Sequence, residues 1–143
     1  MDAIIFMDDV LVPWEKVFLY RDVDLANNLS PSTHQYNHSG HQVVTKNVAK
    51  CEFVLGVASM MVEILGSESI GQVHGLLAEV IENLEVMKAL LCTAEVNATL
   101  DEWGVMCPAT IPITVARNMF IRMYPRMIEI IQLLGSSSLM ALP

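Results

Sequence analysis

The chain has 143 residues, of which 53% are hydrophobic and 17% are charged, and its formal net charge is −8. The length is that of one ordinary domain, and the hydrophobic content excludes intrinsic disorder. The acidic excess excludes nucleic acid as a partner, because a phosphate backbone would be repelled. The two most apolar windows, residues 53–62 and 103–116, are shorter than the roughly 20 residues of a membrane-spanning helix, so we expect no membrane span.

The cysteines and the first residues indicate the cellular compartment. The three cysteines, Cys51, Cys92 and Cys107, form no CxxC pair, and their odd number is typical of reduced thiols in the cytosol. The start of the chain lacks the basic region of a secretory signal. We therefore expect a cytoplasmic protein.

Residues 1–20 predict β-structure. Short runs of β-forming residues at 4–7, 10–12 and 17–20 are separated by acidic residues and proline. Because two or three strands are not stable alone, we interpret residues 1–20 as terminal strands of a β-domain whose other strands lie elsewhere. We expect Trp14 to pack under the helices and anchor this segment to them.

Residues 21–38 are polar and are interpreted as a connection with one short helical turn. Residues 39–143 then contain three long helical patterns. The first has apolar residues at alternating spacings of four and three between Val44 and Leu65, and Gly66 is a plausible stop. Its part at 53–62 is apolar nearly all round, which predicts a place in the middle of a bundle.

The second helical pattern begins with a capping box, Ser69 to Gln72, and keeps the same apolar spacing through Ala98. The third runs from about Thr114 to Leu134, with a kink expected at Pro125. The predicted fold is therefore mainly α, an antiparallel helical bundle preceded by a short β remnant. Its wide apolar faces predict a homo-oligomer, a dimer or a tetramer, with the first two helices near the interface.

Three histidines have the spacing of one helix face: His34, His38 and His41. Such a face could bind zinc, but Pro31 and Gly40 interrupt the helix, and no carboxylate or cysteine lies between the histidines to complete a site. We therefore interpret them as polar loop residues near a subunit contact and predict no metal site.

No catalytic residue can be nominated from motifs. The sequence contains no GxSxG, GxGxxG, Walker or HExxH motif. The arginines Arg117, Arg122 and Arg126 do not share one stripe, and we expect them at solvent or at an interface.

Three segments resemble one family. They are DAIIFMDDVLVPWEKVFLY at residues 2–20, HQVVTKNVAKCEFVLG at 41–56 and IIQLLGSSSLMALP at 130–143. The first is similar to the Val-Pro-Trp-Glu stretch, and the last to the end of the final bundle helix, in the two-component flavin hydroxylases typified by the oxygenase component of 4-hydroxyphenylacetate 3-monooxygenase. The resemblance covers essentially the whole chain, in order.

The resemblance implies a fold of the acyl-CoA dehydrogenase type, of which this chain would be the C-terminal bundle. It implies ortho-hydroxylation of a phenolic substrate with oxygen and with reduced FAD supplied by a separate flavin reductase. In the family the flavin-ring site and the phenol pocket lie in upstream domains. We therefore expect no catalytic residue in this chain, and we expect the chain alone to be inactive.

The resemblance also implies contacts with the adenosine–pyrophosphate end of FAD. They fall on the end of the third helix, at Gln132, Leu133, Gly135, Ser136 and Ser137, and the bound flavin would belong largely to a neighbouring subunit. Because a helix C-terminus repels phosphate, binding there would have to come from outward N–H groups, serine hydroxyls and the Gln132 amide. By similarity to the acyl-CoA dehydrogenase arrangement, His41 and Gln42 are weaker candidates for the same cofactor.

Two alternatives remain open. One is a catalytically silent helical oligomerisation module. The other is a relative of the 4-hydroxybutyryl-CoA dehydratases, whose iron–sulfur cluster is ligated in part by a histidine and a cysteine seven residues on. Seven residues after His34, His38 and His41 stand His41, Thr45 and Val48, which disfavours the dehydratase.

Overall fold

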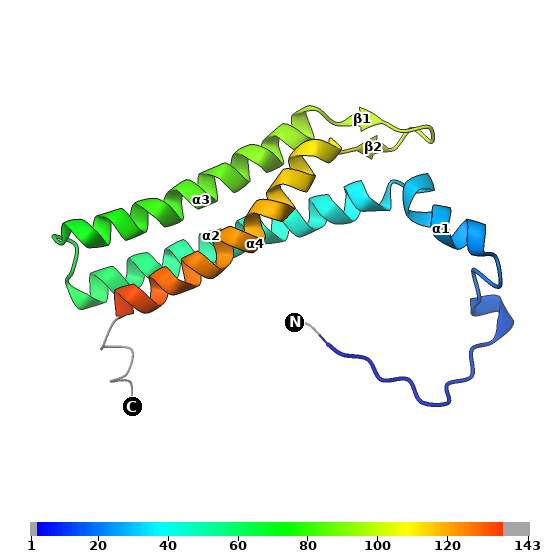
Figure 1. Ribbon diagram of the computed structural model, residues 1–143, viewed down its shortest axis with the longest axis horizontal. Coiled ribbons are helices and arrows are strands. Elements are labelled where there is room, and N and C mark those ends of the chain that lie inside the picture. Colours follow the sequence, from blue (N-terminus) through cyan, green and yellow to red (C-terminus); the bar gives the residue numbers. More distant parts are fainter. Residues whose placement is uncertain (1–2, 136–143) are drawn as a thin grey trace.

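The computed structural model describes residues 3–135 of the chain. Three long helices lie side by side and reverse direction from one to the next (Figure 1), which confirms the predicted antiparallel helical bundle. The elements in chain order are η1 (Trp14–Lys16), α1 (Val23–Ser32), α2 (Gln35–Leu65), α3 (Gly71–Val96), β1 (Thr99–Leu100), β2 (Met106–Cys107) and α4 (Thr110–Gly135).

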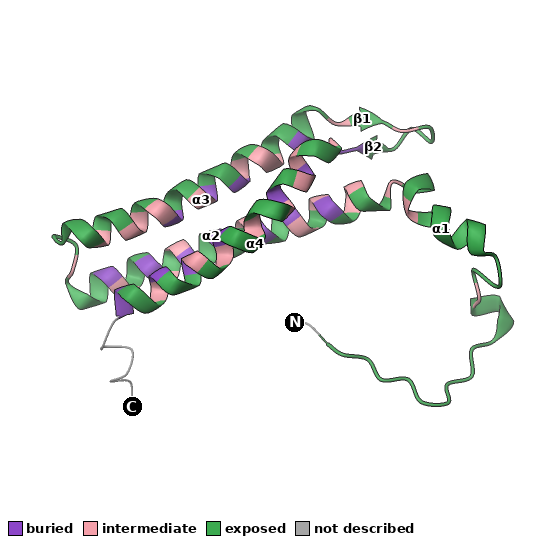
Figure 2. Cartoon of the chain, in the orientation of Figure 1, coloured by how far each residue is buried: buried purple, intermediate pink, exposed green. Residues whose placement is uncertain are grey.

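The core is the seam that α2, α3 and α4 share. Each helix contributes apolar residues at spacings of three and four, so that one stripe of each faces the other two. Figure 2 shows these buried positions on the inner sides of the three helices. The largest fully buried side chains are Met87, Ile113, Met127, Ile130, Val44, Val80 and Cys51.

One glycine sets the distance between α2 and α4. Gly40 is buried, and a Cβ atom at this position would lie 2.5 Å from the Cγ2 atom of Ile113. Ile113 is itself fully buried, so its side chain has little room to move away. The close approach of these two helices therefore requires a residue without a side chain.

The end of α2 and the start of α3 can be compared with the stop and start signals predicted from the sequence. Gly66 ends α2 in the left-handed conformation with φ 59°, which confirms the predicted stop. The predicted capping box is wrong, because α3 begins at Gly71 after Ile70, with no side-chain cap. The Ile70 N–H donates to the Ser67 carbonyl, and this bond keeps Ser69 in a turn before the helix starts.

The connection between α3 and α4 is a small hairpin that the helical patterns of the sequence do not predict. β1 and β2 pair antiparallel, with Thr99 opposite Cys107. The Asp101 carboxylate accepts hydrogen bonds from the N–H groups of Trp103 and Val105, and Gly104 has φ 77°. An Asp and a Gly three residues apart were the available turn signal.

Helix α4 begins at Thr110, four residues before the expected start at Thr114. It continues through Pro125 to Gly135 as one helix. Residues 21–38 also differ from the expected connection, because they contain the ten-residue helix α1 and the first turn of α2.

Residues 3–20 lie away from the bundle and are almost entirely exposed (Figures 1 and 2). This segment has no strand and only the short η1, so its assignment to a β-domain stays a prediction. The expectation for Trp14 is wrong: its side chain is 68% exposed and packs edge-to-face on Tyr20, with ring centres 4.9 Å apart, instead of on the helices.

The outer faces of the bundle remain rich in apolar side chains. The expectation that residues 53–62 lie in the middle of the bundle is only half met, because Val54, Ala58 and Val62 are buried whereas Phe53 is 72% exposed. A three-helix core has room for one stripe of each helix. The second apolar stripe of α2 is therefore left on the surface.

Truncation of a core residue on α4 should separate core packing from surface packing. Ile130 is fully buried and Ile128 is 37% exposed on the same helix. Ile130→Ala should lower the free energy of unfolding by about 2–5 kcal/mol, because it leaves a cavity in the seam. Ile128→Ala should lower it by less than about 1 kcal/mol. Urea denaturation measures both, and equal losses would contradict the assigned core.

Candidate functional site

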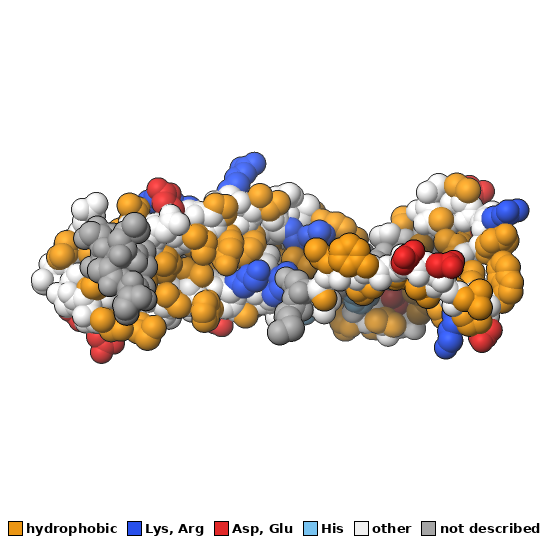
Figure 3. Space-filling view, turned by 90° about the horizontal axis from the view of Figure 1, so that it is seen from below, with side chains coloured by type: hydrophobic (Ala, Val, Ile, Leu, Met, Phe, Trp, Pro, Cys, Tyr) orange, Lys and Arg blue, Asp and Glu red, His pale blue; other side chains and the backbone are white. Residues whose placement is uncertain are grey.

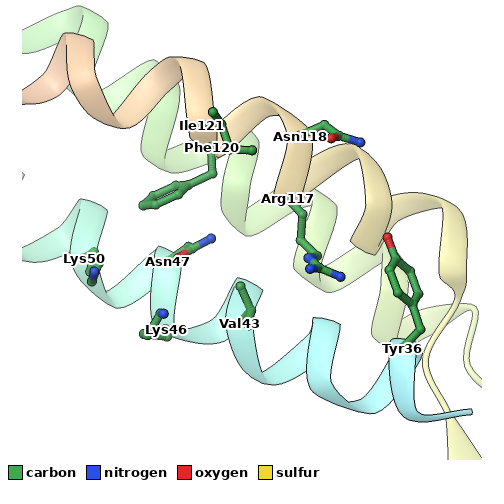
Figure 4. Close-up of a pocket in the computed structure, with 9 residues that line it drawn as sticks. All are labelled: Tyr36, Val43, Lys46, Asn47, Lys50, Arg117, Asn118, Phe120 and Ile121. Carbon is green, nitrogen blue, oxygen red and sulfur yellow. The ribbon is translucent and has the colours of Figure 1, made fainter. Parts of the chain in front are cut away.

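A groove between α2 and α4 is the first of three candidate binding sites. We call it the basic groove; it encloses about 410 Å³. Figure 4 shows the Asn47 amide directed from α2 toward α4, and the Arg117 and Phe120 side chains directed from α4 toward α2. The lining residues are Tyr36, Val43, Lys46, Asn47, Lys50, Arg117, Asn118, Phe120 and Ile121.

Aromatic rings hold two of the three cations of the basic groove. The Arg117 guanidinium carbon lies 4.9 Å from the centre of the Tyr36 ring, and the Lys50 Nζ atom lies 5.5 Å from the centre of the Tyr124 ring. Tyr124 in turn stacks on Phe120, with ring centres 5.0 Å apart. A cation on an aromatic face is attracted by the ring quadrupole but keeps its full charge.

The basic groove is lined by three basic residues and by no acidic residue. Among the described residues, no carboxylate lies within the 4.0 Å salt-bridge distance of Lys46, Lys50 or Arg117. Two cations elsewhere on the bundle, Lys88 and Arg126, are paired with glutamates. Figure 3 shows Lys and Arg side chains gathered over the middle of the helical body on the face it displays.

Arg126 behaves differently from Arg117, although both lie on α4. It donates two hydrogen bonds to the Glu79 carboxylate, at 2.8 and 3.0 Å, and also contacts Glu129. These bonds raise the pKa of Arg126 and lower the pKa of Glu79. Arg126 therefore joins α4 to α3 and is not free for a ligand, whereas Arg122 is exposed.

The hairpin end of the bundle is the second place. His34 Nε2 lies 2.9 Å from Glu102 Oε2, and His41 Nε2 lies 2.8 Å from Glu95 Oε1. The hydrogen bond from His34 lowers the pKa of Glu102. His38 and His41 line a cavity of about 250 Å³ beside the hairpin.

The three histidines do not act as one set. His34 precedes α2 in the left-handed conformation with φ 49°, so it leaves the helical spacing that the sequence suggested. Within residues 3–135, no group of three or more His, Cys, Asp or Glu side chains is placed to hold a metal ion. Each of His34 and His41 instead pairs with a glutamate of the α3–hairpin region.

The two buried cysteines offer no activated nucleophile. Burial raises the pKa of both the Cys51 and the Cys107 thiols. A raised pKa keeps a thiol protonated at neutral pH, and the thiolate is the reactive form.

The end of α4 is the third place. Gln132 and Leu133 are exposed on its last turn, and Gly135 is buried. Ser136 and Ser137, which complete the expected FAD contact, lie outside the described residues. The side chains available to a ligand in the described part of this turn are thus one amide and one apolar group.

The weaker FAD candidates lie at the opposite end of the bundle. His41 and Gln42 are in the second turn of α2, near the hairpin, whereas the end of α4 lies beside the far end of α2 (Figure 1). At 1.5 Å per residue, His41 is about 36 Å from the far end of α2. Within one chain, the candidate FAD contacts at the end of α4 and those at His41 and Gln42 therefore lie far apart.

The basic groove was missed because its parts are far apart in the sequence. The sequence patterns predict Arg117 at solvent or at an interface and lead to no prediction for Lys46 and Lys50. The available signal was the spacing of four between Lys46 and Lys50, which places both on one helix face. Nothing local to α2 indicates that Arg117 would face them.

The described helices include none that is long and apolar enough to cross a membrane.

Comparison with known proteins shows the family to which the chain belongs. Residues 26–143 match the family described as "4-hydroxyphenylacetate 3-hydroxylase C terminal". The chain is 43% identical over 143 residues to the 4-hydroxyphenylacetate 3-monooxygenase oxygenase component of Thermus thermophilus, covering 100% of this chain and 30% of that protein. It is 43% identical over 142 residues to the corresponding protein of a Geobacillus species, covering 99% of this chain and 29% of that protein.

A solved structure agrees with these sequence relatives. The oxygenase component HpaB of 4-hydroxyphenylacetate 3-monooxygenase, complexed with FAD and 4-hydroxyphenylacetate, superimposes with a TM-score of 0.88 at 43% identity. The match covers 95% of this chain and 29% of that one. The chain thus spans less than a third of the length of the relatives it matches.

Proposed function

Because the chain belongs to the family of 4-hydroxyphenylacetate 3-hydroxylase C-terminal domains, we propose that it serves as the C-terminal helical bundle of an FAD-dependent phenol ortho-hydroxylase. The substrate would be a phenolic small molecule such as 4-hydroxyphenylacetate. The observation that carries this proposal is the match over residues 26–143, together with the 0.88 TM-score to an oxygenase component that binds FAD and 4-hydroxyphenylacetate.

The part of this chain in the reaction would be to bind and position, not to react. FAD, reduced by a separate flavin reductase, would supply the oxygen-transfer chemistry when bound. The exposed Gln132 amide and Leu133 side chain at the end of α4 fit a contact with a polar cofactor that has an apolar part. Gly135, Ser136 and Ser137 would complete that contact, and His41 and Gln42 would meet a cofactor at the other end of the bundle.

The remaining parts of the proposal concern partners and compartment. The exposed apolar side chains on α2 and in residues 3–20 support an assembly in which other polypeptide covers them. We propose a homo-oligomer, a dimer or a tetramer, that works with a flavin reductase in the cytoplasm. Residues 1–20 would belong to a β-domain, residues 21–38 would connect it to the bundle, and residues 39–143 would form the bundle.

The hydroxylase activity can be tested on the complete gene product that contains this chain. Incubated with 4-hydroxyphenylacetate, oxygen, FAD and a flavin reductase, it should form the ortho-hydroxylated product, measured by chromatography. If 4-hydroxyphenylacetate is not consumed while FAD is reduced normally, the hydroxylase proposal is wrong. The alternative function, a catalytically silent oligomerisation module, is then favoured.

The FAD contact can be tested on the same protein by titration with FAD. Gln132→Ala should weaken FAD binding by about tenfold, because one hydrogen bond to a polar ligand group is lost. Gly135→Val should weaken it as well, by filling the space of a buried glycine. Gln35→Ala, an exposed amide at the opposite end of the bundle, is the matched control. Unchanged affinity for FAD in both α4 variants would show that this turn ends the helix without contacting FAD.

The assembly can be tested on the 143-residue chain by sedimentation at micromolar concentration. The apolar surface predicts a dimer or a tetramer. Phe53→Ser should shift the equilibrium toward the monomer, because it removes a ring that is 72% exposed in the single chain. A clean 15.9 kDa monomer for the unsubstituted chain would contradict the prediction.

A further inference from the structure

The basic groove gathers charge that the chain does not neutralise. The sequence has 16 acidic and 8 basic residues, yet no acidic residue lines this groove, whereas three of the basic ones, Lys46, Lys50 and Arg117, do. In a protein with two acids for every base, a groove that excludes carboxylates concentrates positive potential at one place. We propose that the basic groove binds a small anionic ligand of the nucleotide class, with phosphate groups and an aromatic part.

The cations are placed to hold a multivalent anion. Lys46 and Lys50 are one helical turn apart on α2, so their Cβ atoms are about 5–6 Å apart on one face. Arg117 approaches from α4 on the other side of the groove (Figure 4). A guanidinium binds phosphate oxygens through a planar fork, and an ammonium binds them as a point charge. Phosphate groups between α2 and α4 would therefore meet positive charge from both helices.

Aromatic partners position two of these cations, Arg117 and Lys50, for a ligand. Tyr36 is fixed by the contact between its hydroxyl and Thr114 Oγ1, at 3.1 Å, and it carries Arg117 on its face. Lys50 lies over Tyr124. Because these interactions position the cations without neutralising them, an incoming phosphate does not have to displace a carboxylate.

The groove also offers a wall for the aromatic part of the ligand. The Phe120 side chain points into the space between the helices, and Val43 and Ile121 lie in the same lining. Asn47 adds an amide that is only 4% exposed and can both donate and accept hydrogen bonds. A volume of about 410 Å³ lies within the range of small-molecule sites, about 300–1,000 Å³.

This site is separate from the FAD contact proposed at the end of α4. Arg117 and Gln132 are 15 residues apart on one helix, which corresponds to roughly 20 Å. The inference does not depend on the hydroxylase proposal, because it uses only the charges and shape of the groove. Loss of one site by mutation should therefore leave the other intact.

The test is isothermal titration of the 143-residue chain with ADP, inorganic pyrophosphate and adenosine. ADP should bind most tightly, pyrophosphate more weakly, and adenosine weakest, since it lacks the phosphates. The double substitution Lys46→Gln, Lys50→Gln should weaken ADP binding at least tenfold, and Arg117→Gln should do the same. Raising the salt concentration should weaken ADP binding to the unsubstituted chain.

Arg122→Gln is the matched control, because Arg122 is an exposed arginine on α4 outside the groove lining. It should change ADP affinity by less than twofold, and circular dichroism should show that every variant keeps its helices. A further arm adds FAD: absence of competition with ADP supports a nucleotide site separate from the FAD contact, and competition would contradict that separation.

Three results would overturn the proposal. The first is that neither ADP nor pyrophosphate binds, and the second is that ADP and adenosine bind with equal affinity. The third is that Arg122→Gln lowers the affinity for ADP as much as the groove variants do. Salt-sensitive self-association that the double substitution abolishes, without any ADP binding, would make the groove an interface for an acidic protein segment instead.

Discussion

The contact between Gly40 and Ile113 is the constraint on which the shape of the bundle depends. Only a hydrogen atom fits between the α2 backbone and the Ile113 side chain at this point. Because both residues are buried, the two helices are held close together here. Tyr36 lies one turn before Gly40 and Arg117 one turn after Ile113, so this contact brings the two residues within cation–π distance. The basic groove is thus a direct consequence of one close approach in the core.

Charge is distributed over the bundle according to what each side chain faces. Where α3 meets α4, Arg126 is neutralised by Glu79, and where α2 meets the hairpin region, His41 and His34 contact glutamates. Between α2 and α4 two of the three cations, Lys50 and Arg117, contact aromatic rings instead. Surface ion pairs contribute little to stability, so these differences matter more for what the surfaces can bind than for holding the helices together.

The sequence was sufficient to predict the long helices because their apolar spacing is regular over many turns. Gly66 as a helix end and the antiparallel order of α2, α3 and α4 followed from local signals. The resemblance of residues 2–20, 41–56 and 130–143 was sufficient to predict the family. These signals are all contained in short stretches of chain.

The errors concern contacts that local patterns do not encode. Trp14 was expected under the bundle, but its surroundings depend on residues beyond its own segment, and it packs on Tyr20. The capping box at Ser69 failed because a backbone hydrogen bond within the loop delays the start of α3. The basic groove requires Lys46, Lys50 and Arg117 to meet across two helices, which depends on Gly40.

The most direct test of that dependence is a crystal structure of the Gly40→Ala variant. A stability measurement alone would combine the effect of the clash with the effect of the better helix propensity of alanine. We predict that α2 and α4 move apart at the hairpin end, that Arg117 leaves Tyr36, and that the contacts near Leu134 are kept. An unchanged helix separation with the new methyl group accommodated would contradict the account.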